Sequence, residues 1–159
     1  MLLKYSRVRS TAYVPLRANP SDAGLDLFYS PEMYGSMDER AFDVLVEPGD
    51  SVIIPTGIKL EVPHGYCFEI KNRSGNAAKK SLIVGACVVD SGYEGEIFVN
   101  LHNIGKKSQV IEPGMKIAQG LLIYSPPFRL YEVSESELYR DSVTISNRGH
   151  GALGSTDEN

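Results

Sequence analysis

The sequence has few cysteines, few histidines and no long apolar segment, and each shortage excludes a class of protein. Cys67 and Cys87 are too few for a disulfide framework and form no C-x-x-C pair for zinc, so we expect both as small core residues. The three histidines show no H-x-x-x-H spacing, which disfavours a histidine metal site. No apolar run approaches the roughly 20 residues that cross a bilayer, so we expect no membrane partner.

A secretion signal and a basic charge excess are also missing. The opening segment "MLLKYSRVRS" has neither the apolar stretch nor the cleavage site of a signal peptide, which predicts an intracellular, cytoplasmic protein. The formal net charge of −4 argues against broad nucleic-acid binding, because that requires a basic face. A chain of 159 residues with 42% hydrophobic and 23% charged residues fits a single globular domain. Any polyanion is therefore expected to bind locally.

Alternation of apolar and polar residues with period two is the main structural signal. This pattern is typical of half-buried strands. It covers 58–62, 66–71 and 97–101, and short β-branched or apolar runs occupy 42–46, 51–55, 108–112 and 142–146. Helix signals are confined to 75–80 and to 134–140, where Ser134 and Glu137 have capping-box spacing. Many short strands with Pro-Gly turns between them predict an all-β barrel or sandwich.

Five segments are polar or glycine-rich where an all-β domain ordinarily has plain turns. They are "DAGLDL" (22–27), "NRSGNA" (72–77), "GACVVDSGYEGE" (85–96), "KIAQG" (116–120) and "RGHGALGSTD" (148–157). The last contains a formal G-x-G-x-x-G, but a dinucleotide fingerprint needs a helix and an acidic residue about 20 positions further on. Two interpretations of 148–157 stay open: a frayed terminus, or a mobile arm that closes over an anion.

The order and spacing of these segments resemble the five motifs of the trimeric dUTPase family over nearly the whole chain. The resemblance implies a distorted, jelly-roll-like β-barrel over 1–146 and a flexible C-terminal arm over 147–159. It implies a homotrimer with shared active sites that hydrolyses dUTP to dUMP and pyrophosphate with Mg²⁺. Such a dUTP diphosphatase limits uracil in DNA and supplies dUMP for dTMP synthesis. The segment 30–40 reads as a surface loop longer than is usual in the family.

Independently of the resemblance, the types of residue in these segments support a triphosphate ligand. A triphosphate requires a guanidinium, open backbone N–H groups and small hydroxyl donors. This inventory occurs at Arg73, Ser74 and Gly75 before a helical turn, and again in the terminal segment at Arg148, Gly154, Ser155 and Thr156. The resemblance also implies that Gln119 lies near the phosphates and that Asp26 meets substrate-bound Mg²⁺ through water, in keeping with the tendency of Mg²⁺ to retain waters.

The segment 85–96 carries the expected catalytic and base-binding residues. Asp90 is an acid in an apolar strand run, and such a carboxylate is either paired or functional. The resemblance assigns to it the activation of the water that attacks the α-phosphorus. It also implies that Tyr93 lies against the deoxyribose and excludes a 2′-hydroxyl, although Tyr93 also reads as a plain rim aromatic. Backbone groups of Ala86, Cys87, Val88 and Val89 are expected to read uracil and reject cytosine.

The chain departs from the family pattern at three positions. Leu153 stands where a phenylalanine usually stacks over uracil, so it is expected to cover the base without stacking. Cys87 replaces a frequent glycine in the uracil hairpin, and Asn72 replaces a proline that fixes φ.

Two other functions are alternatives to the diphosphatase hypothesis. A dCTP deaminase would need a glutamate where this chain has Asn100, and asparagine cannot shuttle a proton. The second is a non-catalytic regulatory relative, which the joint presence of Asp90, Gln119 and Arg148 disfavours.

Overall fold

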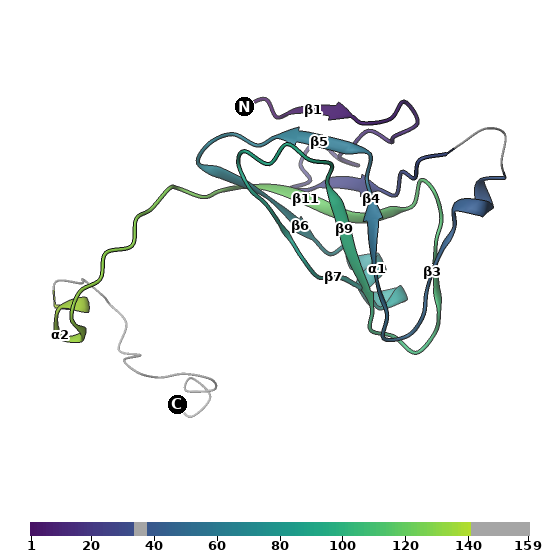
Figure 1. Cartoon of the computed structure of the whole chain (residues 1–159). Helices are drawn as coiled ribbons and strands as arrows, with labels where there is room; N and C mark the ends of the chain where they lie inside the picture. Colours follow the sequence, from purple (N-terminus) through teal and green to yellow (C-terminus); the bar gives the residue numbers. More distant parts are fainter. Residues whose placement is uncertain (34–37, 141–159) are drawn as a thin grey trace. The chain divides into compact units, whose positions relative to one another are not determined.

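The computed structural model describes residues 1–33 and 38–140, which belong to two units. The first unit is Met1–Pro127, and the second begins at Phe128. Among the described residues of the first unit, short strands surround one core, with one short α-helix, α1 (Ser74–Lys80) (Figure 1). This arrangement confirms the predicted all-β class. The predicted boundary between 146 and 147 lies outside the described residues and stays a prediction.

The strands of the first unit pair entirely antiparallel. A two-stranded sheet joins β1 (Lys4–Arg7) to β5 (Ile58–Glu61), and another joins β3 (Val44–Val46) to β10 (Gln109–Ile111). A four-stranded sheet has the order β2 (Leu25–Phe28), β11 (Lys116–Tyr124), β6 (Tyr66–Lys71), β8 (Val88–Val89). A three-stranded sheet has the order β4 (Ser51–Pro55), β9 (Phe98–Asn103), β7 (Leu82–Val84).

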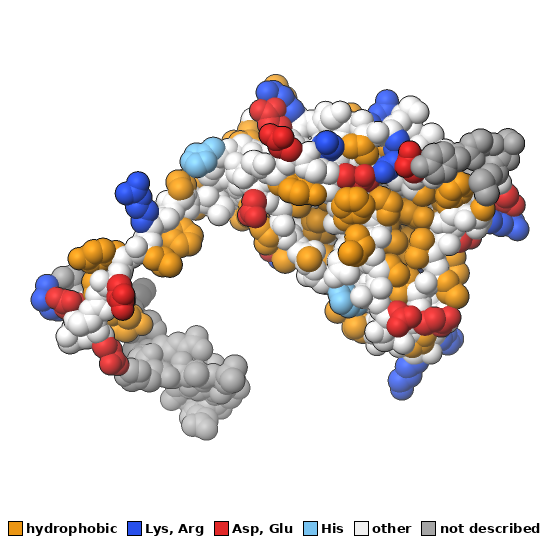
Figure 2. All heavy atoms as spheres, in the orientation of Figure 1, with side chains coloured by type: hydrophobic (Ala, Val, Ile, Leu, Met, Phe, Trp, Pro, Cys, Tyr) orange, Lys and Arg blue, Asp and Glu red, His pale blue; other side chains and the backbone are white. Residues whose placement is uncertain are grey.

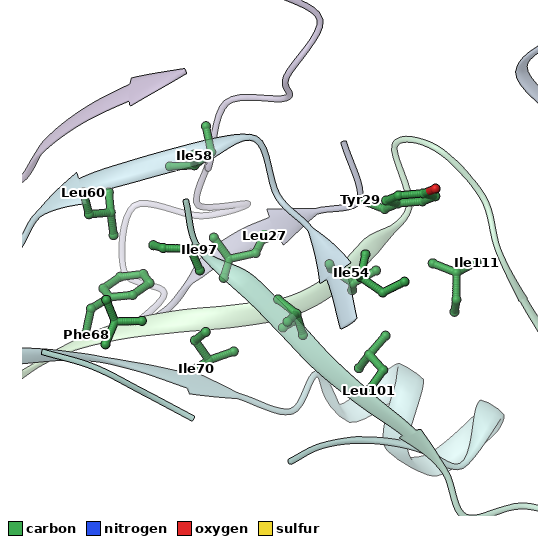
Figure 3. Packing of buried hydrophobic residues seen from close by; sticks show 14 of the residues in the cluster. Leu27, Tyr29, Ile54, Ile58, Leu60, Phe68, Ile70, Ile97, Leu101 and Ile111 are labelled. Carbon is green, nitrogen blue, oxygen red and sulfur yellow. The ribbon is translucent and has the colours of Figure 1, made fainter. Parts of the chain in front are cut away.

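The core lies where the inward faces of these sheets meet. Alternate residues of each strand point inward, as strand geometry requires. The labelled side chains of Figure 3 belong to this cluster: Leu27, Tyr29, Ile54, Ile58, Leu60, Phe68, Ile70, Ile97, Leu101 and Ile111. Burying an aliphatic or aromatic side chain of this size contributes about 1.5–3 kcal/mol to folding. The period-two pattern of the sequence is therefore the pattern that builds the core.

Most predicted strands are confirmed to within one or two residues. The predicted strand 51–55 is β4, and those at 58–62, 66–71, 97–101 and 108–112 correspond to β5, β6, β9 and β10. The prediction for 42–46 is wrong in its first half, because a 3-10 helix, η1 (Glu39–Phe42), precedes β3. The carboxylate of Asp38 accepts a hydrogen bond from the Arg40 N–H and so favours that turn. The predicted strand 142–146 lies outside the described residues.

Other expectations need correction. The segment 116–120 was placed at a turn position, but it begins β11, the nine-residue strand at the centre of the fold. The surface-loop prediction is wrong where it begins, because Ser30 is buried and its hydroxyl accepts a hydrogen bond from the Tyr13 N–H. Both cysteines are free and half-buried, so the expectation that they are core residues is wrong.

Both predicted helices are present but short. In α1 (Ser74–Lys80) the buried amide of Asn76 donates to the carbonyls of Lys116 and Ile117, which anchors the helix to β11. In the second unit α2 (Glu135–Leu138) has the predicted capping box between Ser134 and Glu137. Across the described residues, no helix is long and apolar enough to cross a membrane.

Candidate active site

A cavity of about 530 Å³ collects residues from three of the polar segments. Its lining residues are Ala18, Asp22, Ala23, Gly24, Asp26, Arg73, Ser74, Gly75, Gln119 and Leu121. The structure therefore brings together the predicted group of Asp26, Arg73, Ser74, Gly75 and Gln119. We call this space the phosphate cavity.

Strand pairing explains why these distant residues meet. β11 lies between β2 and β6, and Gln119 pairs with Asp26 on one side and with Lys71 on the other. The chain leaves β6 at Lys71 and turns through Arg73 into α1, which Asn76 holds against β11. One central strand thus sets the positions of all three segments.

The phosphate cavity contains a buried carboxylate between two cations. Asp26 Oδ1 accepts a hydrogen bond from Arg73 Nε at 2.8 Å, and Asp26 Oδ2 lies 2.7 Å from Lys116 Nζ. A buried carboxylate needs such partners, because an unpaired charge away from water is costly. This ion pair uses the Nε of Arg73, and the two Nη groups are the part of a guanidinium suited to bidentate binding of phosphate. The charged residues that line the cavity are Asp22, Asp26 and Arg73, and Lys116 pairs with Asp26.

Gln119 is held by the turn that precedes Arg73. Its Nε2 donates to the carbonyl of Asn72 at 2.9 Å, and a Cβ added to Gly24 would lie 2.7 Å from its Oε1. Asn72 in turn accepts a hydrogen bond from the Val84 N–H through its side-chain oxygen at 2.6 Å. Asn72, which replaces the usual proline, therefore ties the turn to β7 through a bond that proline lacks.

A second cavity, of about 220 Å³, is lined in part by residues of the segment 85–96. Its lining residues are Ile70, Ala86, Val88, Val89, Asp90, Tyr93, Glu96, Ile97 and Phe98. We call this space the base cavity. Cys87 does not line it, and the Cys87 carbonyl accepts a hydrogen bond from the Ile70 N–H at 2.6 Å.

Asp90 and Tyr93 lie in a tight turn at the end of β8. The Tyr93 N–H donates to the Asp90 carbonyl at 3.2 Å, and Gly92 has φ of +90°, a value that favours glycine. The Tyr93 hydroxyl donates to the Glu96 carbonyl at 2.9 Å. Asp90 is exposed in the chain taken alone, although the strand residues before it are apolar.

The two cavities share no lining residue. The structure of one chain therefore does not bring Asp90 and Tyr93 together with Arg73 and Gln119. The remaining predicted residues, Arg148, Leu153, Gly154, Ser155 and Thr156, lie outside the described residues.

Some residues of the site were not identified from the sequence. Lys116, Asn76 and Glu96 all lie inside quoted segments. Nothing in their spacing shows that Lys116 pairs with Asp26, that Asn76 anchors α1 or that Glu96 lines the base cavity. Strand pairing and burial provide that information.

The donor set fits a substrate-borne Mg²⁺ better than a protein-built metal centre. No group of three His, Cys, Asp or Glu side chains among the described residues could hold a metal ion. Asp22 and Asp26 are the carboxylates that line the phosphate cavity, and both oxygens of Asp26 already contact cations. Mg²⁺ commonly keeps several waters and is held by substrate phosphates with one or two carboxylates, an arrangement these residues allow.

Fold and site together define an antiparallel β protein with a polar cavity, where Arg73, Ser74 and the backbone of Gly75 are groups suited to binding phosphate. The sequence model of the dUTPase family matches residues 10–156. The chain belongs to the dUTPase family, as the five motifs had indicated.

Individual relatives agree with this assignment. A deoxyuridine 5'-triphosphate nucleotidohydrolase of Gloeothece citriformis is 37% identical over 158 residues, covering 98% of this chain and 97% of the relative. One from Chlamydia trachomatis is 39% identical over 117 residues, covering 72% of this chain and 77% of the relative.

Solved structures show the same fold. A mutant dUTPase of Staphylococcus bacteriophage 80alpha with dUpNHpp has a TM-score of 0.80 at 25% identity, covering 98% of both chains. A mutant dUTPase from phage phi11 of S. aureus has a TM-score of 0.74 at 23% identity, covering 86% of this chain and 99% of that chain; its structure describes the coordination of a structural Mg(II) ion.

Proposed function

We propose that this chain is a dUTP diphosphatase that hydrolyses dUTP to dUMP and pyrophosphate. The observation that carries the proposal is the division of the motif residues between two cavities. The phosphate cavity contains Arg73, Ser74 and Gly75, and the base cavity has Asp90 at its rim. A nucleoside triphosphate needs both kinds of surface, one for its charged oxygens and one for its base and sugar. Membership of the dUTPase family supports the choice of dUTP.

The phosphate cavity supplies charge and hydrogen-bond donors to the triphosphate. Arg73 offers its Nη groups, Ser74 a hydroxyl, and Gly75 a backbone N–H without a side chain in the way; Gln119 offers an amide. Bound Mg²⁺ would neutralise part of the phosphate charge, with Asp26 contacting it through water. We further propose that Arg148, Gly154, Ser155 and Thr156 of the terminal arm complete the binding of the phosphates.

Asp90 acts as the general base of the reaction. Its carboxylate accepts a proton from a water molecule lying in line with the α-phosphorus. The water oxygen forms a bond to the α-phosphorus while the bond from the α-phosphorus to the bridging oxygen breaks, so pyrophosphate leaves and dUMP remains. A positioned base of this kind contributes about 10²- to 10⁴-fold in rate.

The base cavity recognises uracil and deoxyribose. β8 is the last strand of its sheet, so one side of its backbone is unpaired within that sheet and can bind the edge of a base as a further strand would. Backbone groups of residues 86–89 would pair with uracil, and cytosine would present a donor where uracil presents an acceptor. Tyr93 lies against the deoxyribose, and Leu153 covers the base from the arm.

A homotrimer with shared active sites would unite the two cavities. The phosphate cavity of one subunit and the base cavity of another can together form one complete site, although neither chain does so alone. A second observation supports assembly: hydrophobic side chains gather over the face on which β4 and β9 lie (Figure 2). Ile53 of β4 is 69% exposed, and Phe98 of β9 is also exposed. Large exposed apolar patches mark interaction surfaces.

The deaminase alternative is not favoured by the position of Asn100. Its side-chain oxygen accepts a hydrogen bond from His102 Nε2 at 2.8 Å, within the sheet of β4, β9 and β7. Asn100 lines neither the base cavity nor the phosphate cavity.

The variant Asp90→Asn tests the mechanism. Asparagine has nearly the same shape but does not accept the proton, so kcat should fall by at least about 10². Binding of dUTP with Mg²⁺ should stay within about tenfold of the parent, because the phosphate contacts are untouched. Single-turnover hydrolysis and equilibrium binding on one preparation measure both quantities. Retained turnover would show that another group activates the water, and lost binding would show that Asp90 is structural.

A substrate panel tests the reaction itself. Pyrophosphate release is measured with dUTP and with the four common deoxynucleoside triphosphates in the presence of Mg²⁺. The proposal predicts release from dUTP well above the others. Ammonia release from dCTP would identify a deaminase, and no release from any nucleotide would identify a non-catalytic relative.

A further inference from the structure

A partly buried ion pair lies beside the base cavity and joins two segments that are far apart in the sequence. Arg9 Nη1 and Nη2 donate to the two carboxylate oxygens of Glu96 at 2.9 and 2.8 Å, and the side chains are only 17% and 14% exposed. Glu96 Oε1 also accepts the Gly57 N–H at 2.7 Å, and Arg9 Nη1 also donates to the Ser30 carbonyl at 2.9 Å. Two-point contacts of this kind fix geometry as well as charge. Glu96 is therefore held in place by groups from two other segments.

The backbone of Glu96 in turn holds Tyr93. The Tyr93 hydroxyl donates to the Glu96 carbonyl at 2.9 Å. The ring folds back over Gly95, where an added Cβ would lie 3.0 Å from ring atom Cε2 and would collide with Cζ and the hydroxyl oxygen. Gly95 thus leaves the space that allows the ring to reach Glu96. The position of the ring follows the position of the Glu96 backbone.

Close packing contributes little to the position of this ring. Tyr93 lines the base cavity of about 220 Å³ and also a separate cavity of about 430 Å³ beside β1 and β5. A side chain with open space on two sides can shift at small energetic cost unless a directed contact holds it. The hydrogen bond to the Glu96 carbonyl is such a contact.

We propose that Arg9 and Glu96 are positioning residues that hold Tyr93 in place and thereby set how strongly the enzyme rejects a ribonucleotide. The inference rests on the proposed function, because it takes Tyr93 to lie against the deoxyribose. A ring free to move away makes room for the 2′-hydroxyl of UTP, whereas dUTP fits in either case. Loss of the ion pair therefore reduces discrimination more than it reduces turnover of dUTP.

Ile97, the core residue next to Glu96, has hydrogen bonds of its own, so the fold does not depend on the ion pair alone. Ile97 is buried, its N–H donates to the Ile58 carbonyl, and its carbonyl accepts the hydroxyl of Thr56 at 2.7 Å. The variant Glu96→Gln keeps an oxygen that can accept the Gly57 N–H and removes the charge that binds Arg9. The change is therefore confined to the contact under test.

The test compares kcat/KM for dUTP and for UTP in the parent and in Glu96→Gln. The ratio of the two values should fall at least about tenfold, in the range expected when a site no longer excludes one small group. Any loss of kcat for dUTP should be smaller than the change in this ratio, because the phosphate and Asp90 contacts remain. The matched control is Glu61→Gln, which removes the exposed ion pair with Lys4 at 2.9 Å. Both residues line the cavity of about 430 Å³ beside Tyr93, but the change leaves the contacts of Arg9, Glu96 and Tyr93 in place and should leave the ratio unchanged.

Two further variants separate positioning from general stability. Tyr93→Phe keeps the ring and removes the hydroxyl, so it should lower the dUTP/UTP ratio, and combining it with Glu96→Gln should lower the ratio no further than the stronger single change. Arg9→Lys keeps the charge without the two-point contact, and its ratio should lie between those of parent and Glu96→Gln. If Glu96→Gln does not fold, the comparison of Arg9→Lys with the parent provides the test.

Two results would overturn the inference. The first is an unchanged dUTP/UTP ratio, including equal losses for both nucleotides together with a lower melting temperature. The second is additive effects of Tyr93→Phe and Glu96→Gln. Calorimetric binding of dUMP and UMP gives the same comparison without turnover. A parent that binds dUMP in preference to UMP but hydrolyses no dUTP would contradict the proposed function, and the binding ratio of the variants would still decide the positioning role.

Discussion

Replacing Gly120 by alanine tests how tightly the centre of the fold is packed. Gly120 lies on β11, next to Gln119, and a Cβ added there would collide with Cζ and Cε1 of Phe68 and lie 3.0 Å from Cε2. Phe68 is 1% exposed and lies in the core cluster (Figure 3). The ring cannot move toward solvent, so either it or β11 must shift.

The expected loss of stability follows from these contacts. Overpacking a core typically costs about 1–3 kcal/mol, and a collision with two ring carbons belongs at the upper end, near 3 kcal/mol. Part of this loss, about 0.5–1 kcal/mol, is offset because alanine loses less backbone entropy than glycine on folding. The net loss is then about 2 kcal/mol. For a chain of this length it corresponds to a melting temperature lower by about 4–8 °C.

Thermal unfolding at fixed protein concentration measures this loss, because assembly makes the melting temperature depend on concentration. The control is Gly75→Ala in α1, where an added Cβ meets no atom within 4 Å. It should melt at the parent temperature or slightly above, since alanine is favoured over glycine in a helix by up to about 1 kcal/mol. Adding Phe68→Leu to Gly120→Ala should give a coupling of at least about 1 kcal/mol. Parent-like melting of Gly120→Ala, or strict additivity with Phe68→Leu, would refute the reasoning.

Two predictions concern the terminal arm. Truncation after Ser146 should leave a trimer with near-parent melting and little turnover, because residues 148–157 are rich in glycine and carry few apolar side chains; light scattering, calorimetry and activity assays check this. Loss of the folded state, or full activity without the arm, would contradict it. Leu153→Phe should tighten dUTP binding by up to about 1–3 kcal/mol through stacking on the base, as equilibrium binding would show. Weaker binding would mean that Leu153 packs for another purpose.

The strands and the core follow from the sequence because side-chain alternation is a local property. Residues such as Ile58 and Leu60 point to one face whatever the rest of the chain does. The short helix at 74–80 was also predictable, although its anchor Asn76 was not. The missed strands β1, β2 and β7 are three or four residues long, and alternation over so few positions is weak evidence. The nine-residue β11 was missed for another reason, because its apolar residues do not alternate with polar ones.

The candidate site was predictable as a set of motifs but not as a geometry. Arg73 and Asp26 were both expected near the phosphates, yet their ion pair and its second cation, Lys116, depend on the pairing of β2, β11 and α1. Likewise, the glycine of "KIAQG" read as a turn residue, whereas the ring of Phe68 lies where its side chain would be.

The sequence by itself determined the all-β class, the family and the chemical types of the site residues, because motif order and alternation are written along the chain. The tertiary structure decided which of these residues meet. It placed Gln119 beside Asp26, separated Asp90 from Arg73 into a different cavity, and joined Arg9 to Glu96. These contacts depend on strand order and register, which are fixed by the packing of whole sheets against one core and not by any local pattern.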